Sequence, residues 1–428
     1  MKKTVFLIGF FLFVIGSIFF YKNFYLFVAK YENFKFNLTK SKIIANNNKV
    51  EKNLEKEIYK FNNVIYNYKE YSLEKFGVKF SDLIDEKPIG YFDVYKNRII
   101  FIAFDGTIYS TNNIEDIKKG SFSITKISNP DPRLQIDPED ENSYRNIKIR
   151  DILIHKDNIF VVSNRSKIKN DKYYGSIEVL KGIISIEKKQ IKFDSFFSTN
   201  EEYPEPGAHS GGRLIHLEDE NYLLSSADFH LINEYPLLVD KVSSNNSIIG
   251  KTLLLNGKNF KVFSKGHRNI QGLFYDRKNQ IIFSSEHGPS GGDEINLIME
   301  GKNYGWPKSS YGSIGYEFPN HPRKHKKYGF EEPLYYWWPF NCAPSELIIV
   351  NKDFNFEWKD SILASCLSGN HLNGNSLIRF VYDEKQKKLR RKEQFYIGDR
   401  IRDLKYIEDN NILVMLLENK KSLVFIFK

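Results

Sequence analysis

A glycine-rich loop carries the densest chemical signal in this sequence of 428 residues. A strand-like run ends at Ser285, residues 286–292 then read EHGPSGG, and Asp293 and Glu294 follow. Glycine and proline let a loop turn its backbone carbonyls outward, and carbonyls and carboxylates are the oxygen ligands that Ca²⁺ prefers. The loop therefore predicts a calcium site, whereas the plainer interpretation is an ordinary turn capped by an aspartate.

Two other segments hold residue types suited to proton transfer and to anion binding. His209 could act as a general base, because an imidazole titrates near neutral pH. Arg400 and Arg402 stand two residues apart in an extended segment, so their guanidinium groups share one strand face and could bind carboxylates. Taken alone, a histidine of this kind is more commonly a surface residue, and such an arginine pair is more commonly a solvated face.

Together these segments resemble the soluble pyrroloquinoline-quinone (PQQ) dependent glucose/sorbosone and aldose sugar dehydrogenases. The resemblance spans about half of the chain, from Gly207 to Leu413. It is carried by the runs Arg268-Asn269-Ile270-Gln271-Gly272-Leu273, Gly288-Pro289, Asp293 to Ile298 and Asn303 to Pro307, and by the segments Gly207 to Leu214 and Arg400 to Leu404.

This resemblance implies a six-bladed β-propeller that oxidises the anomeric hydroxyl of an aldose and passes hydride to PQQ. By the resemblance, His209 is the catalytic base, and Arg268 stabilises negative charge on the quinone oxygen. Arg400 and Arg402 pair with PQQ carboxylates. The further implied residues are Asn269 and Gln271 on the cofactor side, Gly288 and Pro289 as carbonyl ligands of Ca²⁺, and Asp293, Glu294 and Tyr304 around a second, structural calcium region.

Some positions depart from the family pattern and keep other functions open. Ser368 stands where the family often has a basic residue that helps to hold PQQ, and Glu346 replaces a small residue. Both are compatible with a degenerate propeller that binds sugar or protein without redox activity. A calcium-dependent propeller hydrolase is a third interpretation, against which Arg400 and Arg402 argue.

A short pattern, a polar turn followed by an apolar strand, recurs six times along the chain. Its strands begin at Ile99, Ile159, Tyr222, Ile281, Ile362 and Ile412, at intervals of 60, 63, 59, 81 and 50 residues. Each interval has room for about four strands, which predicts a propeller over residues 88–428 rather than a pair of β-sandwiches. The 81-residue interval indicates a long insertion at about residues 303–332.

The first 87 residues have a different character. An uncharged apolar run from Thr4 to Phe20 follows Lys2 and Lys3, and it predicts a membrane anchor over residues 1–21 with the rest of the chain on the extracytoplasmic, periplasmic side. A cleaved signal peptide is the alternative. Residues 22–87 are expected to form a linker with one amphipathic helix, because apolar positions from Val50 to Tyr68 follow helical spacing.

Composition narrows the partners. The chain carries 63 Lys and Arg against 53 Asp and Glu, a net charge of +10, but the lysines are scattered, which argues against a nucleic-acid interface. Only two cysteines occur, Cys342 and Cys366, and they could pair in an oxidising compartment. The expected partners are an aldose, an external electron acceptor and, through the anchor, a membrane.

Overall fold

The computed structural model describes residues 43–46, 49–53, 57–62, 70–79, 89–134, 149–169, 172–187, 190–199, 203–204, 209–289, 291–312, 324–338, 340–350, 354, 356–367, 373–383 and 385–427. The membrane-anchor prediction falls on residues 1–21, outside this set. Within this set, no helix is long and apolar enough to cross a membrane.

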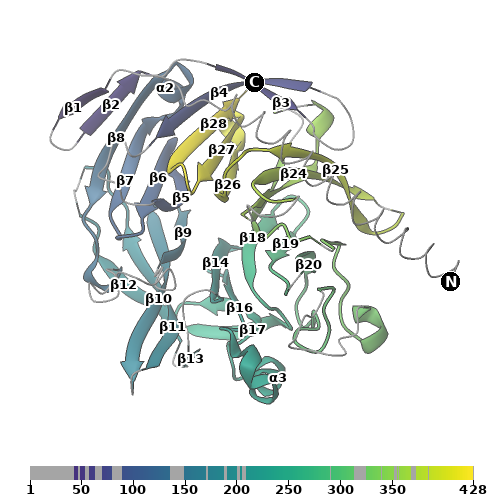
Figure 1. Ribbon diagram of the computed structural model, residues 1–428. Helices are drawn as coiled ribbons and strands as arrows, with labels where there is room; N and C mark the ends of the chain where they lie inside the picture. Colours follow the sequence, from purple (N-terminus) through teal and green to yellow (C-terminus); the bar gives the residue numbers. More distant parts are fainter. Residues whose placement is uncertain are drawn as a thin grey trace, which may run out of the picture.

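Six antiparallel sheets stand around one central axis, which confirms the predicted all-β, six-bladed propeller (Figure 1). Blade one contains β5 (Ile89–Tyr95), β6 (Arg98–Ala103), β7 (Ile108–Asn113) and β8 (Ser121–Ser128), and β2 (Lys49–Asn53) and β1 (Ile43–Asn46) extend its outer edge. Blade two contains β9 (Ile149–His155), β10 (Asn158–Lys169), β11 (Lys172–Ile183) and β12 (Phe193–Ser198), with β13 (Tyr203–Pro204) paired to β11.

The next two blades carry longer connections. Blade three contains β14 (Gly211–His216), β15 (Tyr222–Ser226), β16 (Lys251–Asn256) and β17 (Asn259–Lys265). Blade four contains β18 (Ile270–Asp276), β19 (Ile281–Glu286), β20 (Glu294–Ile298) and β21 (Tyr335–Tyr336). The predicted insertion lies between β20 and β21. Helix α2 (Ile114–Lys118) precedes β8, and α3 (Tyr235–Ser243) precedes β16.

The last two blades complete the ring. Blade five contains β22 (Pro344–Val350), β23 (Ser361–Cys366), β24 (Ser376–Asp383) and β25 (Lys388–Tyr396). Blade six contains β26 (Ile401–Ile407), β27 (Ile412–Leu417) and β28 (Ser422–Phe427), and its outer strands are β4 (Glu70–Lys79) and β3 (Glu57–Asn62). The innermost strands β5, β9, β14, β18, β22 and β26 contact one another in turn, and β26 contacts β5.

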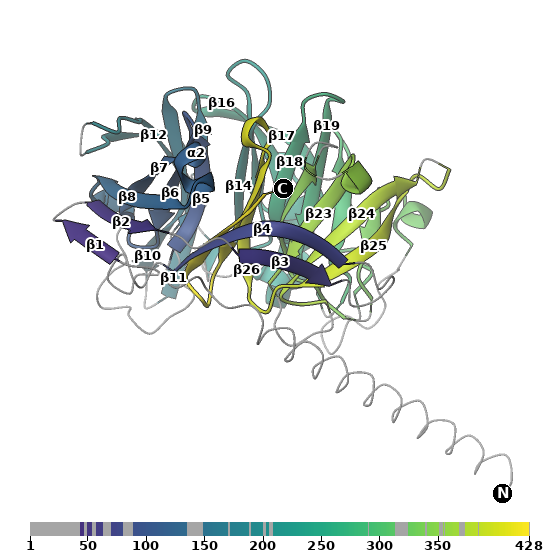
Figure 2. The ribbon, with the colours of Figure 1, turned by 90° about the horizontal axis from the view of Figure 1, so that it is seen from above.

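Two predictions about the N-terminal region are wrong. Strands β2 and β3 lie where an amphipathic helix was expected between Val50 and Tyr68, and β4 belongs to blade six although the propeller was predicted to begin at residue 88. Strand β28 would otherwise present an unpaired edge, and β4 covers it by antiparallel pairing. Strand β3 lies beside β4 in turn (Figure 2). Pairing with a free sheet edge therefore overrides the local helical spacing.

The six recurring turns occupy one structural position. Each joins the first and second strands of a blade and contains a residue with positive φ, namely Asn97 (61°), Lys156 (56°), Asp219 (53°), Gln280 (54°), Asp360 (54°) and Asn411 (54°). Asparagine and aspartate tolerate this left-handed conformation better than most residues. The six predicted copies are therefore the inner hairpins of the six blades.

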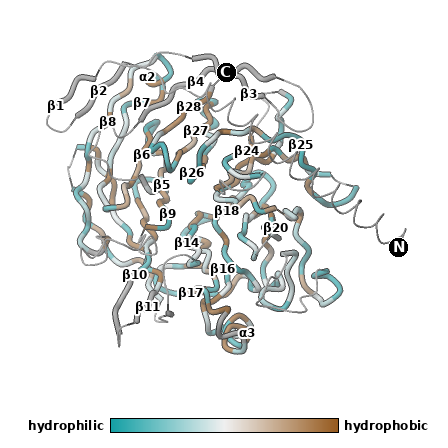
Figure 3. The backbone as a smooth tube through the Cα atoms, viewed as in Figure 1, coloured by the Kyte–Doolittle hydropathy of each residue, from teal (hydrophilic) through white to brown (hydrophobic). Residues whose placement is uncertain are grey.

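Hydrophobic cores fill the spaces between blades. Six clusters of buried side chains lie one at each blade–blade boundary, so no blade has a core of its own within the described chain. Apolar segments accordingly follow the strands in Figure 3. A blade alone would expose both faces, and the closed ring buries them.

A β-bulge interrupts each innermost strand near its beginning. The register shifts at Gly90, Arg150, Gly212–Arg213, Gln271, Ser345 and Arg402. A bulge re-aims the side chain it contains. The bulges therefore form a ring of six equivalent positions at the end of the axis where the innermost strands begin.

Arg213 lies at the centre of this ring. Its Nη1 lies 3.0 Å from the Asp151 carboxylate of blade two and 3.3 Å from those of Glu346 in blade five and Asp403 in blade six. Its guanidinium lies 4.9 Å from the ring centre of Tyr91 in blade one.

Backbone carbonyls complete the coordination of Arg213. Its Nη2 donates to Ser345 O at 3.1 Å and to Arg402 O at 3.4 Å, and its Nε donates to Gln271 O of blade four. The side chain is 6% exposed, so these contacts are shielded from water. One residue of blade three thus contacts all five other blades.

Burial changes the pKa values of two carboxyl groups around Arg213. Burial raises the pKa of Asp151 to about 6 and that of Glu346 to about 8. Glu346, which replaces a small residue of the family pattern, is thus part of the axial ion cluster, which consists of Arg213, Asp151, Glu346 and Asp403.

Arg213→Met should lower the free energy of unfolding by about 3–5 kcal/mol, because it leaves buried carboxylates without their cation. Denaturant unfolding followed by circular dichroism measures the change. Arg277→Met, at an exposed arginine that hydrogen-bonds His216, is the matched control. Equal stability of the two variants would contradict the axial role.

Candidate active site

The predicted site residues lie at one end of the propeller axis. His209, Arg268 and Arg400 directly precede the innermost strands of blades three, four and six, while Gly288 follows β19, the antiparallel neighbour of β18. Because the innermost strands all begin at the same end, residues far apart in the sequence meet there. Within blades three and four, Asp228 N donates to Arg268 O at 2.9 Å, which joins the first two segments directly.

His209 is oriented by a carboxylate that the sequence motifs did not indicate. The His209 Nδ1 atom lies 3.2 Å from Oδ1 of Asp228, and the His209 ring stacks on His230 with centroids 3.6 Å apart. Asp228 is in turn held by the His230 backbone N–H at 3.1 Å and by Trp306 Nε1 at 3.1 Å. With Nδ1–H donating to Asp228, Nε2 of His209 is the atom that can accept a proton.

Electrostatics keep the His209 imidazole neutral. Burial, together with the positive charge of Arg268, lowers the pKa of His209 below its ordinary value, although Asp228 counteracts the shift. Burial by itself would raise the pKa of Asp228, but the hydrogen bond with His209 and the charge of Arg268 lower it. A neutral imidazole beside an ionised aspartate is the arrangement of a general base with its orienting partner.

Arg268 connects the histidine to the glycine-rich loop. Its Nη1 donates to His287 O at 3.1 Å and to Gly288 O at 2.8 Å, and its guanidinium lies 5.5 Å from the centre of a Trp306 ring. Burial, followed by the proximity of His209 and the charge of Arg268, lowers the pKa of His287 to about 3, so this side chain is neutral as well. The site therefore combines a fixed positive charge with two neutral imidazoles.

The Asp293 side chain holds the glycine-rich loop by accepting backbone hydrogen bonds. Its Oδ1 accepts from Gly288 N at 2.9 Å, and its Oδ2 accepts from Cys342 N at 2.8 Å and Ala343 N at 2.7 Å. Burial raises the pKa of Asp293 to about 6, although these three hydrogen bonds favour its charged form. The Asp293 side chain thus uses both oxygens to position the loop.

Glu294 and Tyr304 line one small pocket together with Arg268, Gly288 and Pro289. The Tyr304 hydroxyl donates to Leu297 O and accepts from Met299 N, so its role in this structure is to hold backbone. Burial, with the nearby Glu286, raises the pKa of Glu294 well above its ordinary value. Within the described chain, no three His, Cys, Asp or Glu side chains gather as metal ligands.

Asn269 and Gln271 lie within hydrogen-bonding distance of each other. Gln271 Nε2 donates to Asn269 Oδ1 at 2.8 Å, and Asn269 O accepts from His287 N at 3.0 Å. Asn269 is buried, and Gln271 occupies the bulge position of blade four. Both residues therefore belong to the same end of the axis as Arg268.

Arg400 and Arg402 share a carboxylate. Arg400 Nε donates to Glu418 Oε2 at 2.8 Å, and Arg402 Nη2 donates to both Glu418 oxygens at 2.8 and 2.9 Å. The two arginines therefore reach one carboxylate, although Arg400 precedes β26 and Arg402 lies in the bulge of this strand. The Arg402 Nε atom is buried without a hydrogen-bond partner in the described structure, so this side chain retains a donor for a further acceptor.

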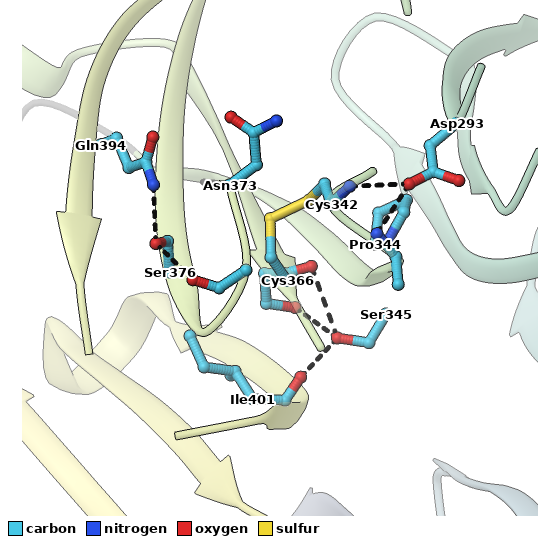
Figure 4. Close-up of a disulfide and its surroundings, with 12 residues drawn as sticks. Asp293, Cys342, Pro344, Ser345, Cys366, Asn373, Ser376, Gln394 and Ile401 are labelled. Carbon is cyan, nitrogen blue, oxygen red and sulfur yellow. Dashed lines mark hydrogen bonds between the residues drawn. A yellow bond between two sulfur atoms is a disulfide. The ribbon is translucent and has the colours of Figure 1, made fainter. Parts of the chain in front are cut away.

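A disulfide links the segment that precedes β22 to the end of β23 in blade five. Cys342 and Cys366 are bonded, and the Cys342 backbone N–H donates to Asp293 (Figure 4). Leu367 N also donates to Ala343 O at 3.0 Å. The pairing that the sequence left open is therefore present. Ser368, the other position that departs from the family pattern, lies outside the described residues.

Sequence reasoning missed Asp228, Trp306, His287, Glu418 and Arg150. The tryptophan and His287 lie inside the recognised motifs NYGWP and EHGP, which was the available signal. Asp228, Glu418 and Arg150 stand in strand ends with no local motif, and only the fold brings them to the site.

Comparison with known proteins agrees with this geometry. The family model described as glucose/sorbosone dehydrogenase matches residues 149–425, more than half of the chain. The chain therefore belongs to the glucose/sorbosone dehydrogenase family.

Two individual relatives each match about half of this chain. An uncharacterised protein of Synechocystis sp. is 32% identical over 237 residues, which are 51% of this chain and 56% of that protein. The aldose sugar dehydrogenase of Escherichia coli is 27% identical over 239 residues, which are 51% of this chain and 60% of that enzyme. Both alignments thus span less than two thirds of the relative.

A solved structure, that of the PQQ-bound form of an aldose sugar dehydrogenase from Streptomyces coelicolor, has the same fold. The TM-score is 0.57 at 17% identity, and the superposition covers 87% of this chain and 98% of that one.

Asp228→Asn should lower the pKa of His209 further, because the Asp228 carboxylate is the group that raises it against burial and Arg268. Titration of the histidine ring protons by NMR measures the shift, with His209→Ala identifying the resonance. Asp240→Asn, at an exposed aspartate of α3, is the matched control. A His209 pKa that stays constant or rises in Asp228→Asn would show that the two side chains do not interact as described.

Proposed function

We propose that this protein is a PQQ- and calcium-dependent aldose sugar dehydrogenase that oxidises the anomeric hydroxyl of its substrate. One observation carries the proposal: an Asp228-oriented, neutral His209 stands beside Arg268 and the Gly288–Pro289 loop in a propeller of the glucose/sorbosone dehydrogenase family. The relatives named for aldose sugar oxidation support the substrate class.

The residues present fit PQQ, which carries carboxylates. Arg402 keeps a buried, unpartnered Nε in the described chain, and Arg400 beside it already forms a carboxylate pair with Glu418. Planar guanidinium groups are suited to a second carboxylate at this place. Arg400 and Arg402 would hold the cofactor from blade six, and Arg268, Asn269 and Gln271 would face it from blade four.

The residues present also fit Ca²⁺ through backbone oxygens. Gly288 O accepts one hydrogen bond from Arg268, and Pro289 O accepts a long one of 3.4 Å from Asn341. A carbonyl oxygen has two lone pairs, so each keeps capacity for a hard cation. Asp293 would support this site through the loop, while Glu294 and Tyr304 would stabilise the pocket around it.

The chain's own contribution to the reaction is proton transfer and charge placement. When bound, PQQ would supply an electrophilic ortho-quinone that accepts hydride from the anomeric carbon, with Ca²⁺ as a Lewis acid. His209 Nε2 would take the proton of the anomeric hydroxyl, and Asp228 would stabilise the resulting imidazolium. Arg268 would provide a fixed positive charge where negative charge develops. The product would be a lactone, which has lost one hydride and one proton relative to the aldose.

We further propose that the protein works on the extracytoplasmic, periplasmic face of a membrane, anchored by residues 1–21, and delivers electrons to an external acceptor. The buried disulfide between Cys342 and Cys366 supports an oxidising compartment.

His209→Ala should reduce kcat by about 10²- to 10⁴-fold while PQQ binding persists, because a general base contributes roughly that factor and makes no charged contact with the cofactor. Dye reduction with an aldose panel measures turnover, and absorbance titration measures PQQ binding. His216→Ala, at the other end of β14, is the matched control. Turnover that survives in His209→Ala would assign the base elsewhere.

Removal of Ca²⁺ by a chelator should lower both activity and thermal stability, because a ligand of the native state stabilises it by about 2.7 kcal/mol at one hundred times its Kd. Differential scanning calorimetry and dye reduction measure the two effects. Re-addition of Ca²⁺ but not Mg²⁺ should restore them, since Mg²⁺ demands a tighter octahedral shell. Identical melting curves with and without chelator would remove calcium from the proposal.

A further inference from the structure

Arg150 is a buried guanidinium whose hydrogen-bonding capacity is not used by the described residues. The residue is 8% exposed, and its Nε and Nη2 atoms have no hydrogen-bond partner. Buried donors without acceptors are costly, and an arginine always carries them because it cannot deprotonate in a protein. The unpaired atoms therefore indicate that an acceptor joins Arg150 in the working state.

Backbone features of two neighbouring blades define the position of Arg150. It occupies the bulge of β9, the position equivalent to Gln271 in blade four and Arg402 in blade six. Gly212 of the neighbouring blade makes room for it, because a Cβ at Gly212 would lie 2.5 Å from the Arg150 Cβ. Gly212 also has a φ of 101°, which favours glycine. Two independent backbone features thus accommodate one side chain.

Arg150 lies beside the proposed base. Gly212, which it contacts, is three residues after His209, and the charge of Arg150 contributes to the lowered pKa of the His209 imidazole. Burial lowers the pKa of Arg150 itself to about 10, so the group remains positive at neutral pH. The base and this cation therefore lie close enough for the charge of Arg150 to act on the base.

Arg150 differs from the other buried arginines of the described chain in its lack of a carboxylate. Arg213 pairs with Asp151, Arg402 with Glu418, and Arg379 with Glu393. Asp151, the neighbour of Arg150 in sequence, is engaged by Arg213 and by the Leu214 backbone N–H. Within the described residues, the charge of Arg150 is thus left without a carboxylate.

We propose that Arg150 binds an anionic group of the substrate, so that this enzyme prefers an aldose bearing a carboxylate or phosphate to the neutral parent sugar. The inference rests on the proposed function, which it deepens. The source of the anion is the substrate rather than the cofactor, because Arg400 and Arg402 serve cofactor carboxylates from blade six. Arg150 stands in blade two, next to the histidine that must touch the sugar hydroxyl.

The test compares glucose, glucuronate and glucose 6-phosphate as substrates of the PQQ- and calcium-loaded full chain. Wild type should show a kcat/KM at least about tenfold higher for one of the anionic sugars than for glucose, since a charge-assisted hydrogen bond contributes about that factor. Arg150→Leu should abolish the preference by raising KM for the anionic sugar. Arg150→Lys should retain part of it, and Arg277→Leu, which removes an exposed charge elsewhere, should leave it intact.

A second measurement uses no turnover. Isothermal titration of glucuronate and glucose 6-phosphate into the protein without PQQ should show binding to wild type that is lost in Arg150→Leu. Absence of turnover in wild type together with Arg150-dependent sugar binding would overturn the proposed enzyme activity and keep this inference. Oxidation of all three sugars at equal efficiency would overturn this inference and keep the activity. A preference for the anionic sugar that survives in Arg150→Leu would also overturn this inference. If Arg150→Leu instead lowers the affinity for PQQ and leaves the sugar preference unchanged, Arg150 binds the cofactor and the inference is overturned as well.

Discussion

The contact network of Arg213 is the constraint on which the propeller's active end depends. A propeller has no hydrophobic core on its axis, since the apolar clusters lie between neighbouring blades. Something must therefore fix the six innermost strands relative to one another. One guanidinium does so by contacting carboxylates, backbone carbonyls and an aromatic ring that belong to the five other blades. Its contacts fall at the bulge positions or at the residues that follow them, so the backbone irregularity and the ion cluster reinforce each other.

The same bulges decide which side chains reach the site. A regular strand would alternate its residues between the two faces of a blade, and only the bulge turns an extra side chain toward the end of the axis. Arg150, Gln271 and Arg402 all occupy this position. The ion cluster at this end of the axis has its own cations, Arg213 and Lys405.

Charge in the site is consequently distributed unevenly. The carboxylates around Arg213 are paired with cations, whereas Arg150, Arg268 and Arg402 accompany two neutral histidines. Burial and neighbouring positive charge act in the same direction on an imidazole, and both disfavour its protonation. The arrangement is therefore suited to an anionic cofactor, to proton abstraction by His209 and to a substrate with negative charge.

The sequence by itself determined the blade count and much of the site. Six turns with the same polar residues before apolar strands indicated six blades because every blade needs the same inner hairpin. His209, Arg268 and the Gly288–Pro289 loop were recognisable because contiguous motifs surround them. Only the tertiary structure decided the rest. Local spacing indicated a helix between Val50 and Tyr68, but the chain forms strands there because the sheets of blades one and six offer edges for pairing. Asp228 and Glu418 reach the site through the pairing of the first two strands of their own blades, whereas Arg150 and the hub role of Arg213 depend on contacts across blades. No local pattern encodes contacts whose two sides are separated by 16 to 190 residues.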